Sequence, residues 1–121
     1  MIGWGPCCAG YVGRRRSKKN TRPEIIAATK ELLAQMVSAN RIKIQDIASV
    51  VFSATRDLDA EFPAAAAREL GWKDTPLLCT YEIDVPKSLR KCLRVLMHVN
   101  TRKKQAEMKH IYLKEARSLR R

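Results

Sequence analysis

The chain has 121 residues, 45% of them hydrophobic, which fits one domain (residues 1–121) with one core and excludes wholesale disorder. No apolar run reaches the roughly 18 to 20 residues of a membrane span, and the N-terminus lacks the pattern of a signal peptide, so we expect a cytoplasmic protein. The formal net charge is +12, but residues 20–86 carry seven basic and ten acidic groups, so the excess lies at the two ends.

The N-terminal segment gives a weak strand pattern, and the segment that follows it gives a clear helix pattern. Residues 7–12 predict at best a poor strand, because Gly10 interrupts it. A helix is predicted over residues 21–40, where Thr21 and Glu24 have the spacing of a capping box and Pro23 fits the first turn. Apolar residues then follow at helical spacing.

Strands and a second helix follow in alternation. IASVVFSAT (47–55), TPLLCTYEIDV (75–85) and KCLRVLMHVNT (91–101) predict strands, and a helix from Ala64 to Leu70 ends at Gly71. The tail HIYLKEARSLRR predicts a short helix or turn followed by extended chain. This order predicts an α/β or α+β fold with one sheet packed against helices.

Single polar residues stand inside otherwise apolar elements between residues 62 and 94, namely Arg68, Cys79, Glu82 and Arg94. Charged side chains are rarely buried unless they are paired or bound, so this pattern indicates a pocket for an anionic organic molecule. Each residue also has a plainer interpretation: Arg94 as an edge-strand residue facing water, Cys79 as core packing, and Glu82 as a surface partner of a nearby basic residue.

Two further classes of site find little support. The four cysteines, Cys7, Cys8, Cys79 and Cys92, have no paired C-x-x-C spacing, so we expect reduced thiols and no metal. The basic ends are compatible with RNA or DNA binding, and a basic nucleic-acid-binding protein remains an alternative. However, the chain has only two Trp, three Tyr and two Phe and no nucleic-acid-binding signature, so nucleic acid is not the expected partner.

Three segments, SATRDLDAEFPAAAAREL, PLLCTYEIDVPKSLRKCLRV and HIYLKEARSLR, closely resemble the AroH-type chorismate mutases in order and spacing. The resemblance covers about residues 21–120. It implies an α+β fold with a mixed sheet packed against two helices, forming a pseudo-barrel homotrimer with its pockets between subunits. It further implies conversion of chorismate to prephenate in Phe and Tyr biosynthesis, without a cofactor or metal.

The resemblance also assigns roles by position. It implies that Arg94 reaches the ether oxygen of the breaking bond, and that Glu82 and Cys79 contact the ring hydroxyl. The remaining residues implied at the site bind carboxylates, line the pocket or close its entrance; they are Arg68, Tyr112, Arg120, Phe62, Ala64, Leu77, Leu78 and Leu119. A unimolecular rearrangement needs no nucleophile or proton transfer, and a planar, permanently charged guanidinium suits a developing negative charge.

The N-terminus departs from this family. The family's first strand has the form V-R-A-I-R-G-A-T-T-V-E, and its second Arg binds a substrate carboxylate, but counting back from Thr21 puts Val12 near that position, so the required Arg is missing. One hypothesis is that residues 5–19 are a frameshifted reading of this strand, because a one-base shift of compatible codons encodes V-R-A-V-R-G-T-S-V-E. Sequencing the coding DNA decides it.

If the chain is made as written, Arg14, Arg15 and Arg16 are the candidates for a substitute guanidinium. A displacement of about 1 Å can cost on the order of 100-fold in rate, so we expect the fold and pocket with activity weakened or lost. A catalytically impaired relative that only binds anionic metabolites is therefore the second alternative.

Overall fold

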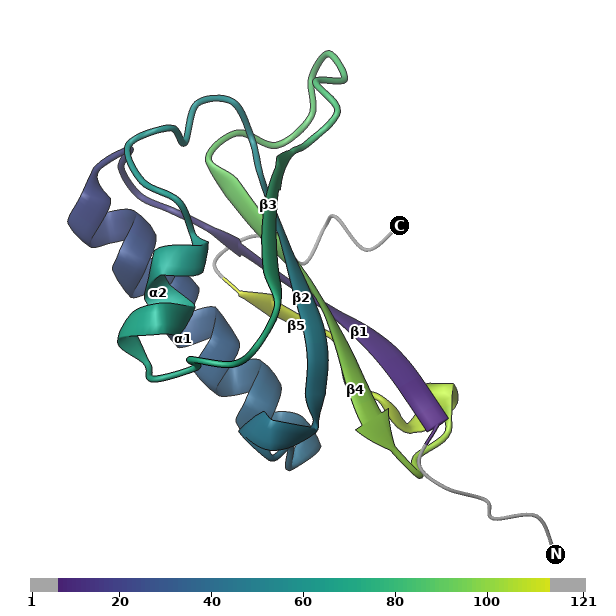
Figure 1. Cartoon of the computed structure of the whole chain (residues 1–121). Helices are drawn as coiled ribbons and strands as arrows, with labels where there is room; N and C mark the ends of the chain where they lie inside the picture. Colours follow the sequence, from purple (N-terminus) through teal and green to yellow (C-terminus); the bar gives the residue numbers. More distant parts are fainter. Residues whose placement is uncertain (1–6, 114–121) are drawn as a thin grey trace, which may run out of the picture.

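The computed structural model describes residues 7–113 and contains five strands, two α-helices and two short 3₁₀ turns in that range (Figure 1). The elements are β1 (Cys7–Arg16), α1 (Arg22–Asn40), η1 (Ile44–Asp46), β2 (Ile47–Ala54), α2 (Ala64–Glu69), β3 (Leu77–Tyr81), β4 (Cys92–Thr101), η2 (Gln105–Glu107) and β5 (Ile111–Leu113).

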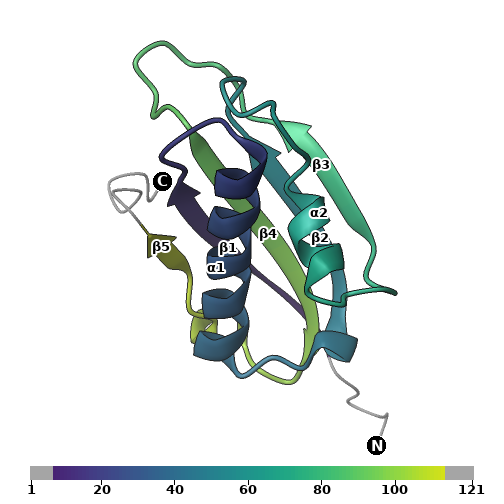
Figure 2. The same cartoon turned by 90° about the vertical axis from the view of Figure 1, so that its left-hand side faces the viewer.

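The strands form one mixed sheet in the order β3-β2-β4-β1-β5. β4 pairs antiparallel with both β1 and β2, while β2–β3 and β1–β5 are parallel pairs. Figure 2 shows that α1 and α2 both cover the same face of this sheet. The expected α+β fold, a mixed sheet packed against two helices, is confirmed.

The core lies between the sheet and the helices. On β4 the side chains alternate: Leu93, Val95, Met97 and Val99 are at most 1% exposed, whereas the residues between them are less deeply buried. Leu32, Leu33 and Met36 of α1 share one core cluster with Val95, Met97 and Val99 of this row. One face of the sheet is therefore the apolar core, and the opposite face is free to carry polar groups.

The predicted α1 is confirmed, together with its N-terminal signal. The Thr21 hydroxyl accepts a hydrogen bond from the Glu24 N–H at 3.4 Å, and Arg41 ends the helix in the left-handed conformation. Arg22 and Lys30 form ion pairs with Glu69 of α2, and Arg22 also pairs with Glu61. These exposed contacts tie α2 and the segment before it to α1.

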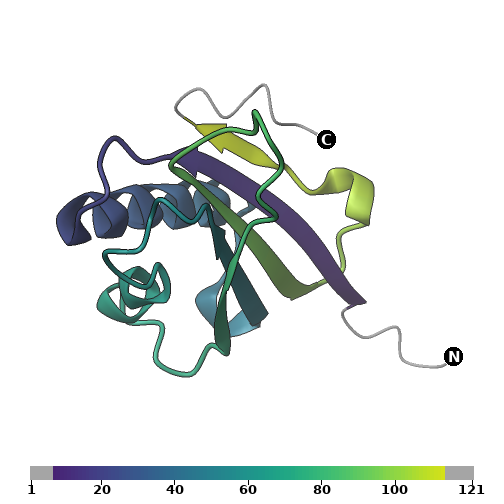
Figure 3. The same cartoon turned by 90° about the horizontal axis from the view of Figure 1, so that it is seen from above.

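The N-terminal segment is a better strand than its sequence indicates. β1 pairs with β4 over ten positions, and Figure 3 shows it lying between β4 and β5. Gly13 faces α1, and a Cβ there would lie 2.5 Å from Met36 Sδ and 2.8 Å from Leu32 Cδ1. The glycine therefore permits the close packing of helix on strand.

The outer edge of β1 is completed by side chains where β5 does not reach. The Gly10 N–H donates to Gln105 Oε1 at 3.0 Å, and Gln105 Nε2 donates back to the Gly10 carbonyl. The Val12 N–H donates to His110 Nδ1 at 3.0 Å. Gly10 thus remains within the strand rather than interrupting it, because its backbone groups are bonded.

Two other predicted boundaries need correction. β3 is shorter than expected, because the chain leaves the sheet after Tyr81. Residues 111–113 form β5 rather than a helix or turn, and they are extended because they pair in parallel with β1. Among the helices of residues 7–113, none is long and apolar enough to cross a membrane.

Candidate active site

One row of side chains crosses all five strands on the face away from the helices. In register from β3 to β5 its members are Thr80, Ser53, Arg94, Arg14 and Tyr112. Residues directly opposite on paired strands share a face, so two guanidiniums, two hydroxyls and a phenol lie side by side. The strand pairing alone assembles this row, since its members are far apart in the sequence.

Arg94 sits at the centre of the row and is held by Glu82. Its Nε donates to Glu82 Oε2 at 2.9 Å, and its Nη2 donates to Glu82 Oε1. The Arg94 side chain is 42% exposed and the Glu82 side chain 19%. Arg94 is therefore not an edge-strand residue, because β4 is the middle strand of the sheet, and Glu82 pairs with Arg94 rather than with a neighbouring surface cation.

A cavity of about 330 Å³ lies in front of this ion pair. Its walls include Val12, Val51 and Leu96, and Glu82 and Arg94 provide its charges. Val12, which counting from Thr21 puts near the family's arginine position, thus lines the same cavity as Arg94. An apolar cavity with a few convergent polar groups is the usual form of a small-molecule site.

Arg14 and Tyr112 extend the site beyond this cavity. The Arg14 guanidinium carbon lies 5.8 Å from the centroid of the Tyr112 ring, within cation–π range. Arg14 is only 7% exposed. The sequence contained Arg14 only as one of three consecutive arginines, and the register of β1 against β4 is the signal that singles it out.

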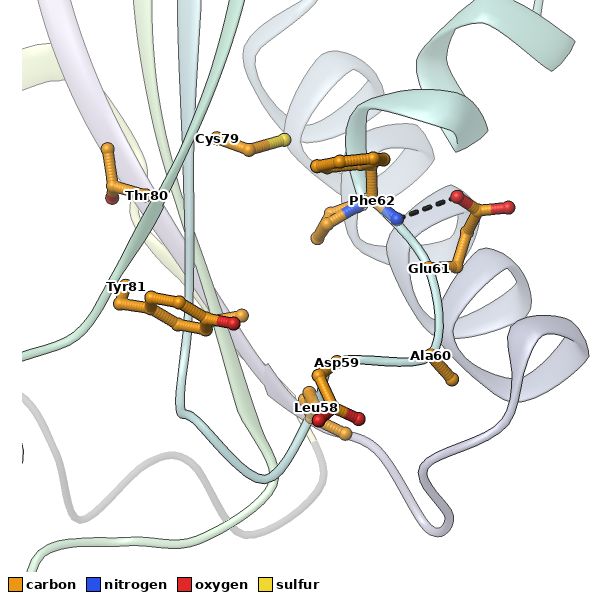
Figure 4. Close-up of a pocket in the computed structure, with 10 residues that line it drawn as sticks. Leu58, Asp59, Ala60, Glu61, Phe62, Cys79, Thr80 and Tyr81 are labelled. Carbon is orange, nitrogen blue, oxygen red and sulfur yellow. Dashed lines mark hydrogen bonds between the residues drawn. The ribbon is translucent and has the colours of Figure 1, made fainter.

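A second cavity, of about 340 Å³, lies on the other side of β3, toward α2. Figure 4 shows Phe62 and Cys79 lining it, with the Cys79 thiol directed toward Phe62. Phe62 is 72% exposed. Burial raises the pKa of the Cys79 thiol, although a hydrogen bond from the Ala64 N–H acts in the opposite sense. The thiol is therefore protonated near neutral pH and lies away from Arg94.

The other sequence-derived site residues are spread over both faces. Arg68 is exposed near the end of α2 and donates to the carbonyls of Trp72 and Lys73. Ala64 begins α2 and Leu77 packs on the core, while Leu78 is 58% exposed. Leu119 and Arg120 lie outside the described residues.

Cys92 lies two residues before Arg94 and is buried. Burial raises the pKa of its thiol to about 11; Glu82 acts in the same direction, while Arg14, Arg94 and Arg16 oppose it. The thiol is thus uncharged near neutral pH. Within residues 7–113, no group of three or more His, Cys, Asp or Glu side chains is arranged to hold a metal ion.

Comparisons with known proteins agree with this geometry. The family model described as chorismate mutase type I matches residues 10–121, so the match begins inside β1. The chain is 41% identical over 112 residues to the chorismate mutase AroH of Bacillus subtilis, covering 92% of this chain and 88% of that protein. It is 42% identical over 112 residues to the chorismate mutase AroH of Thermus thermophilus, covering 92% of each.

A solved structure of a chorismate mutase from Clostridium thermocellum superposes with a TM-score of 0.88 at 49% sequence identity. The superposition covers 90% of this chain and 97% of the Clostridium thermocellum chain. The chain therefore belongs to the type I chorismate mutase family, and its function is that of a chorismate mutase, an isomerase.

Proposed function

We propose that the conversion of chorismate to prephenate, a step toward Phe and Tyr, takes place in the cavity in front of Arg94. The observation that carries this proposal is the pair of hydrogen bonds between Arg94 and Glu82, set on the middle strand beside apolar walls. A guanidinium held in this way is fixed in orientation before the substrate arrives. The cytoplasmic location expected from the sequence stays part of the same proposal.

Arg94 supplies the electrostatic part of catalysis. As the C–O bond lengthens, negative charge grows on the ether oxygen, and a fixed guanidinium stabilises that charge more than it stabilises the ground state. Val51 and Leu96 give the cavity apolar walls, and a less polar surrounding strengthens the interaction. Glu82 orients Arg94 and offers a carboxylate oxygen to the ring hydroxyl of the substrate.

The partner in this proposal is a second copy of the chain, in a homotrimer. Phe62 and Cys79 line the cavity on one side of β3, while Arg94 and Glu82 line the cavity on the other side. These two sets cannot enclose one small molecule within one chain, because the sheet separates them. Residues of both sets meet around one substrate only if two copies each contribute one set.

The surface around β3 supports this assembly. β3 is at the edge of the sheet, and large apolar side chains on it and after it are exposed: Leu78 (58%), Tyr81 (53%), Ile83 (85%) and Val85 (53%). An exposed apolar group beside an open strand edge is typical of a protein–protein contact. The same surface adjoins both cavities, since Thr80 and Tyr81 line each of them.

The experiment that tests the proposed chemistry is the loss of chorismate absorbance with the purified protein and with its Arg94→Ala variant. We expect turnover by the first and a loss of about 100-fold or more in the second, since a comparable donor contributes on the order of 3 kcal/mol to the barrier. Arg94→Lys restores activity only in part, because a point charge replaces a planar fork. Turnover that survives Arg94→Ala would refute the assignment.

A further inference from the structure

Arg14 is a buried cation without a counter-ion in the described part of the chain. Its side chain is on β1, it is 7% exposed, and its Nε has no hydrogen-bond partner within residues 7–113. The Tyr112 ring is its one charge-stabilising contact among those residues. Burying an unpaired charge is costly, so a site that retains one is set up to receive an anion.

The position of Arg14 increases this cost. It lies directly opposite Arg94 in the antiparallel β1–β4 pair. Like charges at such positions are destabilising. Glu82 compensates the charge of Arg94, but no carboxylate in the described range pairs with Arg14. Two neighbouring guanidiniums on one face of the sheet are therefore compensated by the single carboxylate of Glu82, and a bound anion removes the imbalance.

The two neighbouring arginines are accounted for by other contacts. Arg15 faces the helices, where its Nη2 donates to Glu31 Oε2 of α1 at 2.9 Å and its Nη1 donates to the Arg16 carbonyl. Arg16 donates from Nε to the Arg90 carbonyl at 3.2 Å. Arg14 is the member of this run that shares the row with Arg94 and Tyr112.

We propose that Arg14 is a substrate-binding residue, whose guanidinium donates hydrogen bonds to a carboxylate of the dianionic substrate while Arg94 acts at the ether oxygen. Tyr112 positions Arg14 by stacking against it. This inference rests on the proposed function and assigns the carboxylate contact to a residue two positions after Val12, on the same face of the same strand. The altered N-terminus then supplies the missing guanidinium itself.

The test compares Arg14→Met with a matched control, Arg15→Met, which removes a similarly buried arginine from the opposite face of β1. For Arg14→Met we expect the KM for chorismate to rise by about 10- to 100-fold, as for the loss of a charged hydrogen bond, with a smaller change in kcat. Thermal stabilisation by prephenate, measured without turnover, should disappear. In Arg15→Met the KM and the stabilisation by prephenate stay as in the unmodified protein.

The melting temperature without ligand separates binding from a structural role. Removing an unpaired buried cation should leave the Tm of Arg14→Met unchanged or higher, whereas Arg15→Met, which loses its ion pair with Glu31, should melt lower. An Arg14→Met variant that melts lower and binds prephenate normally overturns the proposal. If this variant does not fold, the neutral Arg14→Gln replaces it, and an unchanged KM and prephenate shift would then count against Arg14.

The experiment distinguishes failure of the Arg14 assignment from failure of the proposed function. A protein without turnover contradicts the proposed chemistry, but stabilisation by prephenate that depends on Arg14 still supports the carboxylate contact. A protein with turnover that depends on Arg94 and not on Arg14 upholds the chemistry and refutes the inference.

Discussion

Glu82 and Arg94 form a two-pronged ion pair although Glu82 follows an edge strand and Arg94 lies on the middle strand. The carboxylate reaches across β2, where the residue opposite Arg94 is the small Ser53. The orientation of the Arg94 guanidinium thus depends on a residue that follows an edge strand.

Glu82→Gln should lower kcat by roughly 10- to 100-fold without raising KM. The amide keeps one oxygen, so Arg94 loses one of two charged hydrogen bonds and part of its fixed orientation. Removing a negative charge at the same time favours binding of a dianion in the ground state. Steady-state kinetics check the prediction, with the exposed Asp84→Asn on the same segment as the control. An unchanged kcat contradicts the role of Glu82.

Gly13→Ala should destabilise the fold by about 1 to 3 kcal/mol, because its Cβ meets Met36 and Leu32 at distances shorter than a van der Waals contact. Gly10→Ala is the matched control on the same strand: its Cβ meets only His98 and Leu96 side chains, at 3.3 Å or more. Urea denaturation of both variants measures the difference. Equal midpoints would show that α1 does not depend on close packing at Gly13.

The thiol of Cys92 should make stability depend on pH in the alkaline range. Its pKa is about 11 in the folded protein, raised by burial from an ordinary value of 9.0. Between these values the folded state keeps a proton that the unfolded state releases, so the contribution to stability is complete below pH 9 and is lost as the pH rises toward 11. Relative to Cys92→Ala, the unmodified protein should lose roughly 1 to 3 kcal/mol over this interval. If the curves of unfolding free energy against pH are parallel for the unmodified protein and Cys92→Ala, the prediction is wrong.

Two inactive variants should complement each other if each pocket uses residues from two copies. If the protein is the proposed homotrimer, co-expressing Arg94→Ala with Arg68→Ala, the variant of the carboxylate-binding residue that the resemblance implies, gives mixed assemblies in which about a quarter of the pockets receive both arginines by chance. Activity near that fraction of the unmodified enzyme is expected, while the variants mixed as finished assemblies stay inactive until they exchange subunits. If co-expression restores nothing, Arg68 and Arg94 do not serve one pocket from two copies.

The sequence predicted the helices and strands well. It predicted less well where a given side chain lies in the sheet. The capping signal at Thr21 and the β-branched runs are local, so α1, β2 and β4 were predictable. Whether Arg94 lies at an edge or in the middle depends on which strands pair, which no local pattern records. In the described part of the chain β5 spans Ile111–Leu113 and is extended because it pairs with β1, a non-local contact that the sequence did not reveal, so a helix or turn was predicted there.

One feature of the site was available in the sequence and was missed. Cys79 and Glu82 are three positions apart, and an odd separation along extended chain puts side chains on opposite faces. The thiol accordingly faces Phe62 while Glu82 faces Arg94. Arg14 could not be separated from Arg15 in this way, because the parity of β1 is known only once Gly13 is seen to face α1.

The side chains of Gln105 and His110 bond the backbone of β1 next to the short β5. A foreign peptide that tried to extend the sheet beside Gly10 and Val12 would have to displace both side chains. The two side chains thereby hinder edge-to-edge pairing with another chain, the first step of fibril formation, at this edge of β1. Replacing Gln105 and His110 with alanine should therefore promote aggregation during long-term storage before it affects catalysis.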